Sequence, residues 1–137
     1  MNLPHDNEKT LDGIRVLVVD DCMVVRELMS LTLRPMGAVV DIAETGEDAL
    51  GKIGNTRYDI IFLDVMLPGI DGNRVCKSIK REPKTRHIPV VMLTSRDAVL
   101  DKVRGMMSGA DVYLTKPLVR SALLSAMERC LPEWSRR

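Results

Sequence analysis

The stretch Ile14-Arg-Val-Leu-Val-Val-Asp-Asp21 decides the fold of this chain. Its first six residues are mostly β-branched and apolar, which predicts a short strand buried on both faces. Val24, Leu28 and Leu31 follow at spacings of four and three residues, which predicts a helix directly after the strand. A strand that leads at once into a helix is the repeating unit of a parallel sheet.

The same alternation of strand and helix continues along the chain. Further strands are predicted at residues 38–43, 58–63, 88–93 and 112–114. Apolar spacings predict the helices that follow them, at Ala49 and Ile53, at Val75 and Ile79, at Val99, Val103 and Met106, and at Val119, Leu123, Ala126 and Cys130. Five strands alternating with five helices predict an α/β fold: a doubly wound parallel sheet covered by helices on both faces.

The composition narrows the class of protein. The 137 residues, which match a single domain, carry 20 Lys and Arg against 19 Asp and Glu, a formal net charge of +1. This balance argues against a protein that coats nucleic acid through a diffuse basic surface. An aromatic content of 3% also disfavours stacking on single strands, so we expect no direct nucleic-acid partner.

Three further features indicate a soluble cytoplasmic protein. Cys22, Cys76 and Cys130 lie far apart and form no CxxC motif, so neither a zinc site nor a disulfide framework is expected. Apolar runs are only a few residues long, which predicts no membrane span. Residues 1–13 contain acids and no apolar core, unlike a secretion signal.

Polar residues stand at the carboxyl ends of four of the five predicted strands: Asp20 and Asp21, Asp64, Thr94 and Lys116. Because ligands of open α/β sheets bind at this edge, these side chains are candidates for one site. Each also has a plainer explanation, since an Asp or Thr here is most often a helix cap and a lone lysine is most often solvated. The repeated coincidence favours a site, and three clustered carboxylates would need a hard cation such as Mg²⁺ to offset their repulsion.

Four segments carry a family resemblance because they occur in order and at the right spacing. They are Val-Val-Asp-Asp (18–21), Asp-Ile-Ile-Phe-Leu-Asp-Val-Met-Leu-Pro-Gly-Ile-Asp-Gly (59–72), Pro-Val-Val-Met-Leu-Thr-Ser (89–95) and Gly-Ala-Asp-Val-Tyr-Leu-Thr-Lys-Pro (109–117). Over residues 14–131 the sequence resembles the receiver domain of two-component response regulators. The resemblance implies a flavodoxin-like sheet of strand order 2-1-3-4-5, with an N-terminal extension at residues 1–13 and a tail at residues 132–137.

The resemblance assigns phosphoryl-group chemistry to the acidic residues. Asp64 would be the phosphoacceptor, which attacks a phosphohistidine and becomes an acyl phosphate. Asp20, Asp21, Asp64 and the backbone carbonyl of Met66 would hold Mg²⁺, with Mn²⁺ as a substitute. The chain would then be no enzyme for an external substrate, because it would only gain and lose its own phosphoryl group.

The resemblance also implies a switch. Lys116 would pair with Asp64 or with a phosphoryl oxygen, and its peptide bond to Pro117 would be cis. Thr94 would hydrogen-bond the phosphoryl group, and Tyr113 would rotate into the space that Thr94 vacates. The alternative for Tyr113 is a half-buried tyrosine at the edge of the sheet.

Two residues depart from the commonest pattern of the family. Met66 is apolar where many relatives place a polar side chain, and Arg96 is cationic where many place an acid or an amide. Both would flank the path of the hydrolytic water. Since a Met cannot orient that water, and Arg96 could stabilise the acyl phosphate, the resemblance predicts slow self-dephosphorylation.

The expected function is that of a single-domain response regulator. Its phosphodonor would be a sensor histidine kinase or a phosphotransfer protein, and its output would be a downstream protein bound through the fourth helix, fifth strand and fifth helix. The protein would act as a monomer or as a phosphorylation-dependent homodimer. The segment Asp101-Lys-Val-Arg-Gly105 resembles pilus-linked, twitching-type regulators, which points to taxis or pilus motility.

Several alternatives remain at this stage. The chain could be a receiver excised from a longer regulator or hybrid kinase. An aspartate-nucleophile phosphatase is disfavoured because Asp20-Asp-Cys-Met-Val24 does not match Asp-x-Asp-x-Thr. A flavin or nucleotide binder would need a phosphate loop that is missing after the first strand. A degenerate receiver is disfavoured because every expected acid is present.

Overall fold

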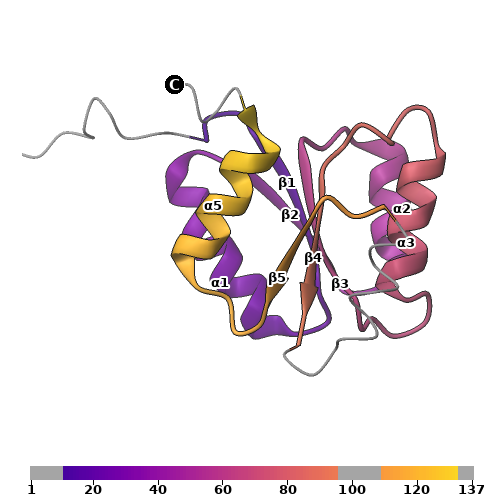
Figure 1. Cartoon of the computed structure of the whole chain (residues 1–137), viewed down its shortest axis with the longest axis horizontal. Coiled ribbons are helices and arrows are strands. Elements are labelled where there is room, and N and C mark those ends of the chain that lie inside the picture. Colours follow the sequence, from indigo (N-terminus) through magenta and orange to yellow (C-terminus); the bar gives the residue numbers. More distant parts are fainter. Residues whose placement is uncertain (1–10, 96–108, 133–137) are drawn as a thin grey trace, which may run out of the picture.

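The computed structural model describes residues 11–95 and 109–132, which form a five-stranded parallel sheet between two layers of helices (Figure 1). The strands are β1 (Arg15–Val19), β2 (Val39–Ala43), β3 (Ile60–Asp64), β4 (Val90–Thr94) and β5 (Val112–Thr115). Their spatial order is β2-β1-β3-β4-β5, and every neighbouring pair is parallel. The predicted fold class and strand order are therefore confirmed.

The described helices lie on both faces of the sheet. They are α1 (Met23–Leu33), α2 (Gly46–Asn55), α3 (Gly72–Arg81) and α5 (Arg120–Cys130), with a short 3₁₀ helix η1 (Arg34–Met36). In Figure 1, α1 and α5 cover one face while α2 and α3 cover the other. The further helix expected around Val99, Val103 and Met106 lies outside the described residues. None of the helices in the described part is long and apolar enough to cross a membrane.

The buried strands divide the core into two clusters, one under each helical layer. Val16 and Val18 of β1 point toward α1 and α5, whereas Leu17 and Val19 point toward α2 and α3. All four side chains have 0% exposure. This follows from the period of two in a strand, because successive side chains leave opposite faces. Burial on both faces therefore explains why β1 is continuously apolar.

Helix α1 is where the sequence predicts, but its apolar stripe faces outward. Val24 and Leu31 are 70% and 71% exposed, and Leu28 is 46% exposed. The buried face instead carries Met29 and Leu33, together with the polar residues Arg26 and Ser30. The spacing of apolar residues predicted the element correctly but not its inner face, because two polar side chains occupy core positions.

Two of the helices begin with a side-chain cap. Thr45 Oγ1 accepts a hydrogen bond from the backbone N–H of Asp48 at 3.0 Å, and Asp71 Oδ1 accepts one from the N–H of Arg74 at 2.9 Å. Each cap satisfies an amide that the first turn leaves without a partner. The caps fix where α2 and α3 begin after the loops at the carboxyl ends of β2 and β3.

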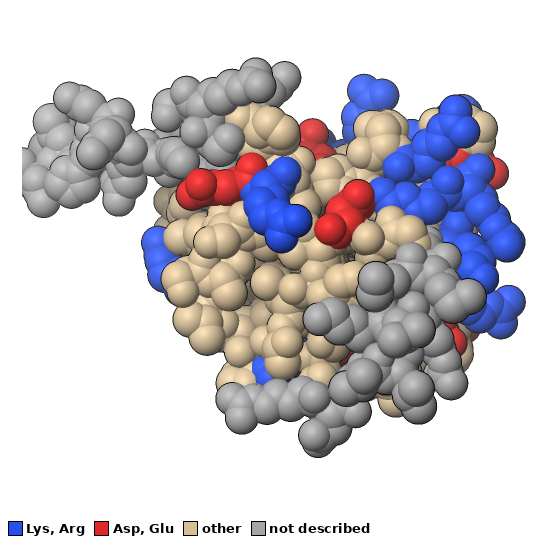
Figure 2. Space-filling model, in the orientation of Figure 1, with Lys and Arg blue, Asp and Glu red and all other residues tan. Residues whose placement is uncertain are grey.

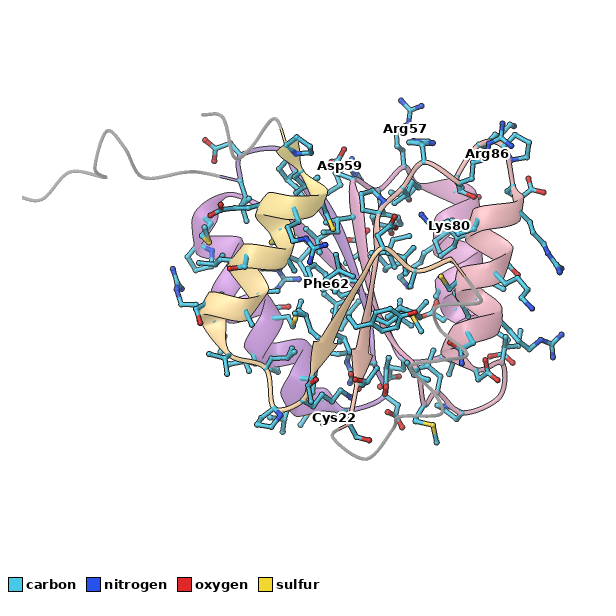
Figure 3. All side chains as sticks on the ribbon, in the orientation of Figure 1. Cys22, Arg57, Asp59, Phe62, Lys80 and Arg86 are labelled. Carbon is cyan, nitrogen blue, oxygen red and sulfur yellow. The ribbon has the colours of Figure 1, made fainter. Side chains whose placement is uncertain are left out.

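The small net charge conceals an uneven distribution. Over residues 73–87, Glu82 is opposed by six cationic residues: Arg74, Lys77, Lys80, Arg81, Lys84 and Arg86. These belong to α3 and to the segment after it, where Figure 2 shows blue side chains gathered on the right of the molecule. Figure 3 shows Lys80 and Arg86 near one end of the sheet and Cys22 near the other. Cys22 directly follows Asp20 and Asp21 in the sequence.

Candidate functional site

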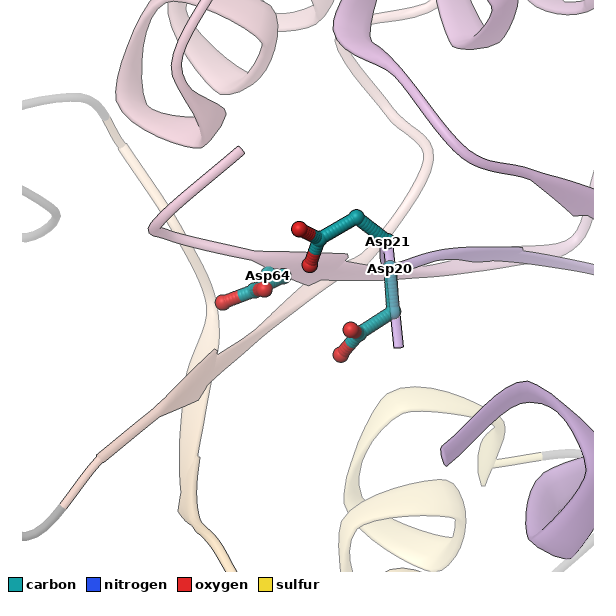
Figure 4. Close-up of side chains that lie close together, drawn as sticks. All are labelled: Asp20, Asp21 and Asp64. Atoms are coloured by element: carbon teal, nitrogen blue, oxygen red, sulfur yellow. The ribbon is translucent and has the colours of Figure 1, made fainter. Parts of the chain in front are cut away.

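Three carboxylates meet at the carboxyl edge of the sheet. Asp20 directly follows β1, Asp21 is its neighbour, and Asp64 is the last residue of β3. Each offers an oxygen, and these oxygens all lie within 4.8 Å of one another (Figure 4). Asp20 is 0% exposed and Asp64 is 5% exposed, whereas Asp21 is exposed. The cluster forms because β1 and β3 are parallel neighbours that end at the same edge.

Backbone amides orient the two buried carboxylates. Asp20 Oδ1 accepts a hydrogen bond from the N–H of Cys22 at 2.9 Å, and Asp64 Oδ1 accepts one from the N–H of Met66 at 3.1 Å. In both cases the donor lies two residues further along, so each carboxylate closes a turn at the end of its strand. The Asp20 carboxylate therefore binds the backbone of Cys22, the residue at the N-cap position of α1.

Lys116 supplies the positive charge at this edge. Its Nζ lies 2.7 Å from Asp20 Oδ2 and 3.3 Å from Asp64 Oδ2. The backbone N–H of Lys116 donates to the carbonyl of Thr94 at 2.7 Å, which ties the loop after β5 to the end of β4. The peptide bond from Lys116 to Pro117 is cis. One ammonium thus faces two buried carboxylates.

The electrostatic balance of the cluster remains negative. Burial and the charge of Asp20 raise the pKa of Asp64 to about 6, against the opposing effect of Lys116. Burial lowers the pKa of Lys116, but Asp20 and Asp64 more than compensate and raise it above its ordinary value. Lys116 therefore pairs with the two buried carboxylates, and its single positive charge does not neutralise the three carboxylates of the cluster.

The donor set of this cluster fits a hard divalent cation. All the side-chain ligands are carboxylate oxygens, the type that Mg²⁺ prefers. Asp20 Oδ2 is buried, and its partner is the ammonium of Lys116 at 2.7 Å. An exposed partner, Asp21, leaves one side open to water, which Mg²⁺ usually retains. The residues present are therefore typical of a magnesium-binding acidic pocket.

The remaining predicted residues lie around the cluster or outside the described part. Thr94 is the last residue of β4 and is 5% exposed. Tyr113 lies on β5, half-buried in the core cluster of α2 and α3, and burial together with Cys76 raises its pKa to about 12. Met66 is 62% exposed, just beyond Asp64. Arg96, the other residue expected to tune dephosphorylation, lies outside the described residues.

Sequence reasoning did not identify two residues that support the site. Arg26 donates from Nη1 to the backbone carbonyl of Asp20 at 2.8 Å, and its position on a helix gave no signal of this contact. Gly72 packs so closely that a Cβ there would overlap the carbonyl oxygen of Asp64. The signal for Gly72 was available, since it ends the turn segment of residues 68–72.

A doubly wound sheet with an acidic pocket and a lysine at its carboxyl edge is the architecture of a signalling receiver. The model of the response regulator receiver domain matches residues 16–128, and the chain belongs to that family. The predicted family is thus confirmed.

Two curated relatives differ in how much of their length the chain covers. PilG of Pseudomonas aeruginosa is 39% identical over 128 residues, which are 93% of this chain and 95% of PilG. The response regulator MprA of a Mycobacterium species is 41% identical over 118 residues, which are 86% of this chain but only 50% of MprA. The chain therefore resembles PilG throughout and MprA over half its length.

Solved structures show the same architecture. The chemotaxis response regulator CheY4 of Vibrio cholerae matches with a TM-score of 0.80 and 33% identity, over 86% of this chain and 98% of CheY4. The signal receiver domain of a signal transduction histidine kinase from Syntrophus aciditrophicus matches with a TM-score of 0.83 and 32% identity, over 91% and 95%.

Proposed function

We propose that this chain is a single-domain response regulator that accepts a phosphoryl group on Asp64 and signals by phosphorylation-controlled protein binding. The observation that carries the proposal is the cluster of Asp20, Asp21 and Asp64 with Lys116 at 2.7 and 3.3 Å from the two buried carboxylates. Similarity to PilG over nearly the whole of both chains supports a single-domain regulator.

Asp64 is the nucleophile of the proposed transfer. With a pKa of about 6, its carboxylate is mostly ionised at neutral pH, which is the form that attacks phosphorus. A carboxylate oxygen bonds to phosphorus as the bond between phosphorus and the donor's histidine nitrogen breaks. The electron pair stays on that nitrogen, which takes up a proton. The product is an acyl phosphate on Asp64.

The other residues of the cluster would bind the cation and offset the charge of the phosphoryl group. The carboxylates of Asp20, Asp21 and Asp64, with the backbone carbonyl of Met66, would hold Mg²⁺ or Mn²⁺. When bound, the cation neutralises charge on the phosphoryl oxygens. Lys116 adds a point charge on the side of Asp64, where it can pair with a phosphoryl oxygen after transfer.

Thr94 and Tyr113 carry the proposed switch. Thr94 ends β4 beside the loop of Lys116, so its hydroxyl is a suitable donor to a phosphoryl group on Asp64. Tyr113 lies on the neighbouring strand, paired with Met92 two residues before Thr94. Movement of Thr94 toward the new charge would open space for Tyr113 to rotate, which alters the surface of β5 and α5.

The partners and setting follow from that role. The donor is a sensor histidine kinase or a phosphotransfer protein, and the output is a protein that binds near β5, α5 and the segment between β4 and β5. We place the domain at residues 14–131, in the cytoplasm, as a monomer or a phosphorylation-dependent homodimer. The chemotaxis regulator CheY4 and the segment of residues 101–105 support a role in taxis or pilus motility.

A second candidate is a receiver that forms part of a longer protein. The half-length match to MprA and the receiver of a histidine kinase both favour it. In that case the site chemistry is unchanged, and phosphorylation would act on an attached domain. A profile of phosphotransfer from each of the host's histidine kinases to this chain would identify the kinase, and with it the signalling pathway, to which the chain belongs.

The proposal is tested by reaction with a small phosphodonor. We expect acetyl phosphate with Mg²⁺ to increase the intact mass of the wild-type protein by one phosphoryl group. Asp64→Asn removes the nucleophile and should abolish the increase, whereas Asp59→Asn, an exposed acid before β3, should retain it. A wild-type protein that forms no adduct, or an Asp64→Asn variant that forms one, would contradict the proposal.

A further inference from the structure

Arg26 is a buried cation on the inner face of α1. The residue is 8% exposed and shares that face with Met29 and Leu33. Arginine is rarely buried unless it is paired, because removing its charge from water is unfavourable. Its Nε is buried without a hydrogen bond, so the guanidinium is only partly compensated. An apolar side chain would fit this helix face better, which indicates that Arg26 does something that packing does not.

The contacts of Arg26 are directed at the acidic loop. Nη1 donates to the backbone carbonyl of Asp20 at 2.8 Å in a buried hydrogen bond. Nη2 lies 3.0 Å from Oε1 of Glu44, whose side chain is 68% exposed in the loop after β2. Glu44 balances the charge and anchors the guanidinium from the other side. Arg26 is thereby held against the carboxyl ends of β1 and β2.

The hydrogen bond from Arg26 to the carbonyl of Asp20 completes a set of contacts that restrain Asp20. The N–H of Asp20 donates to the carbonyl of Ala43 at 3.1 Å, its Oδ1 accepts from Cys22, and its Oδ2 faces Lys116. The carbonyl is the remaining polar group, and Arg26 binds it. That carbonyl belongs to the planar peptide unit whose nitrogen is the N of Asp21. A hydrogen bond that fixes this carbonyl therefore fixes the peptide plane that contains the Cα atoms of Asp20 and Asp21, to which both side chains are attached.

We infer that Arg26 is a positioning residue for the acidic pocket: by holding the peptide plane between Asp20 and Asp21, it sets the geometry in which these two carboxylates bind a divalent cation. The inference rests on the proposed function and adds a residue to it. A positioning role and a purely electrostatic role predict opposite changes in Mg²⁺ affinity when Arg26 is removed. A nearby positive charge repels a cation, so charge alone predicts tighter Mg²⁺ binding without Arg26, whereas positioning predicts weaker binding.

The test compares two arginines that hold a backbone carbonyl. Arg26→Met removes the contacts with Asp20 and Glu44, and Arg26→Lys restores a cation with one donor group. Arg34 is the matched control, because its Nη2 donates to the carbonyl of Val40 at 2.9 Å, away from the pocket. Calorimetry measures Mg²⁺ affinity, and urea unfolding measures stability. The rate of phosphorylation by acetyl phosphate is measured at increasing Mg²⁺ concentrations.

We expect Arg26→Met to lose about tenfold in Mg²⁺ affinity, the lower end for loss of an outer-shell partner. Its phosphorylation should recover at saturating Mg²⁺, which separates weakened metal binding from lost chemistry. Arg26→Lys should regain part of the affinity. Arg34→Met should lose stability but keep the wild-type affinity. If Arg26→Met does not fold, Arg26→Lys, which keeps the positive charge, should still show a smaller loss of Mg²⁺ affinity in the same direction.

Two results would overturn the inference and leave the proposed function intact: Mg²⁺ binding of the Arg26 variants equal to wild type, or tighter than wild type. A wild-type protein that binds no Mg²⁺ would instead remove the proposed function together with this inference.

Discussion

At the scale of single residues, the site depends on one lysine among three carboxylates. Lys116 contacts both Asp20 and Asp64, and a carboxylate that loses such a partner is left buried and uncompensated. The side chain of Lys116 is 25% exposed, so water moderates this cost. A divalent cation at the same carboxylates would act on the same repulsion. Lysine and cation therefore have overlapping electrostatic roles.

Removal of Lys116 should make the fold depend more on Mg²⁺. We expect Lys116→Met to lower the free energy of unfolding by about 1–3 kcal/mol, since it leaves buried acceptors unpaired. Mg²⁺ should then stabilise the variant more than the wild type, as measured by urea unfolding with and without the cation. Lys52→Met is the control, because its pair with Asp48 at 3.1 Å is exposed and should contribute only a few tenths of a kcal/mol. Equal Mg²⁺ effects on wild type and Lys116→Met would contradict this account.

Met66 should govern the lifetime of the phosphorylated state. Its side chain lies two residues after Asp64, is 62% exposed, and has only a weakly accepting thioether sulfur with which to orient an attacking water. Met66→Asn supplies such a group, and a hydrogen bond of about 1 kcal/mol in the transition state gives about fivefold faster decay. Decay of the adduct is followed by intact mass. Met23→Asn, at 65% exposure on α1, should leave the decay unchanged, and an unchanged rate for Met66→Asn would sink the prediction.

At the scale of elements, the placement of α3 sets the backbone around Asp64, the proposed phosphoacceptor. Gly72 begins α3, and its N–H donates to the carbonyl of Val65 at 3.0 Å. The helix approaches so closely that no Cβ fits between Gly72 and Asp64. The turn before α3 and the end of β3 are therefore one packed unit.

Gly72→Ala should disturb that unit. We expect a loss of about 1–3 kcal/mol in the free energy of unfolding from overpacking, together with slower phosphorylation by acetyl phosphate. Gly51→Ala in α2 is the matched control, because a Cβ there meets nothing within 4 Å. That change should stabilise the helix by about 0.5–1 kcal/mol. The expectation fails if both alanines stabilise the protein in urea unfolding.

Tyr58 links β2 to the start of β3 and should make stability fall at high pH. Its hydroxyl donates to Asp41 Oδ2 at 2.7 Å, and burial together with Asp41 raises the pKa of Tyr58 to about 12. The unfolded value is about 10, so the folded state disfavours the phenolate. The contribution of Tyr58 is therefore fully present below pH 10 and lost as pH rises from about 10 toward 12.

Tyr58→Phe isolates this contribution from that of Tyr113, whose pKa is also raised to about 12. We expect the variant to be less stable by about 1–2 kcal/mol at pH 8 through loss of the hydrogen bond. The difference in free energy of unfolding between Tyr58→Phe and wild type should become smaller as the pH rises above 10, as measured by urea unfolding at matched ionic strength. A difference that stays constant with pH would show that Tyr58 does not ionise as proposed.

Helix α1 marks where sequence reasoning reached its limit at this scale. Spacing of Val24, Leu28 and Leu31 predicts a helix correctly, yet these side chains are exposed. The inner face depends on Arg26, whose hydrogen bond to Asp20 exists only once the loop and helix are folded together. A periodic pattern reports the presence of a helix, but it cannot report a polar contact made in three dimensions.

At the scale of the whole molecule, the site follows from topology. Asp20 and Asp64 are far apart in sequence, and the neighbouring parallel strands β1 and β3 bring them together. Sequence alone could predict the acids and Lys116, since strand ends at one edge must meet. Gly72 carried a sequence signal as the end of the turn segment 68–72. Arg26 and Glu44 carried none, because their contacts depend on how loops and helices pack.

The central claim is that Asp64 carries the phosphoryl group, and chemical trapping tests it most directly. Borohydride reduces an aspartyl phosphate to homoserine, so the protein is treated with acetyl phosphate and Mg²⁺, reduced, digested and sequenced by mass spectrometry. We predict homoserine at position 64 alone, and none when Mg²⁺ is removed by a chelator. Homoserine at Asp20, Asp21 or another acid, or its absence from position 64 in the presence of Mg²⁺, would contradict the account.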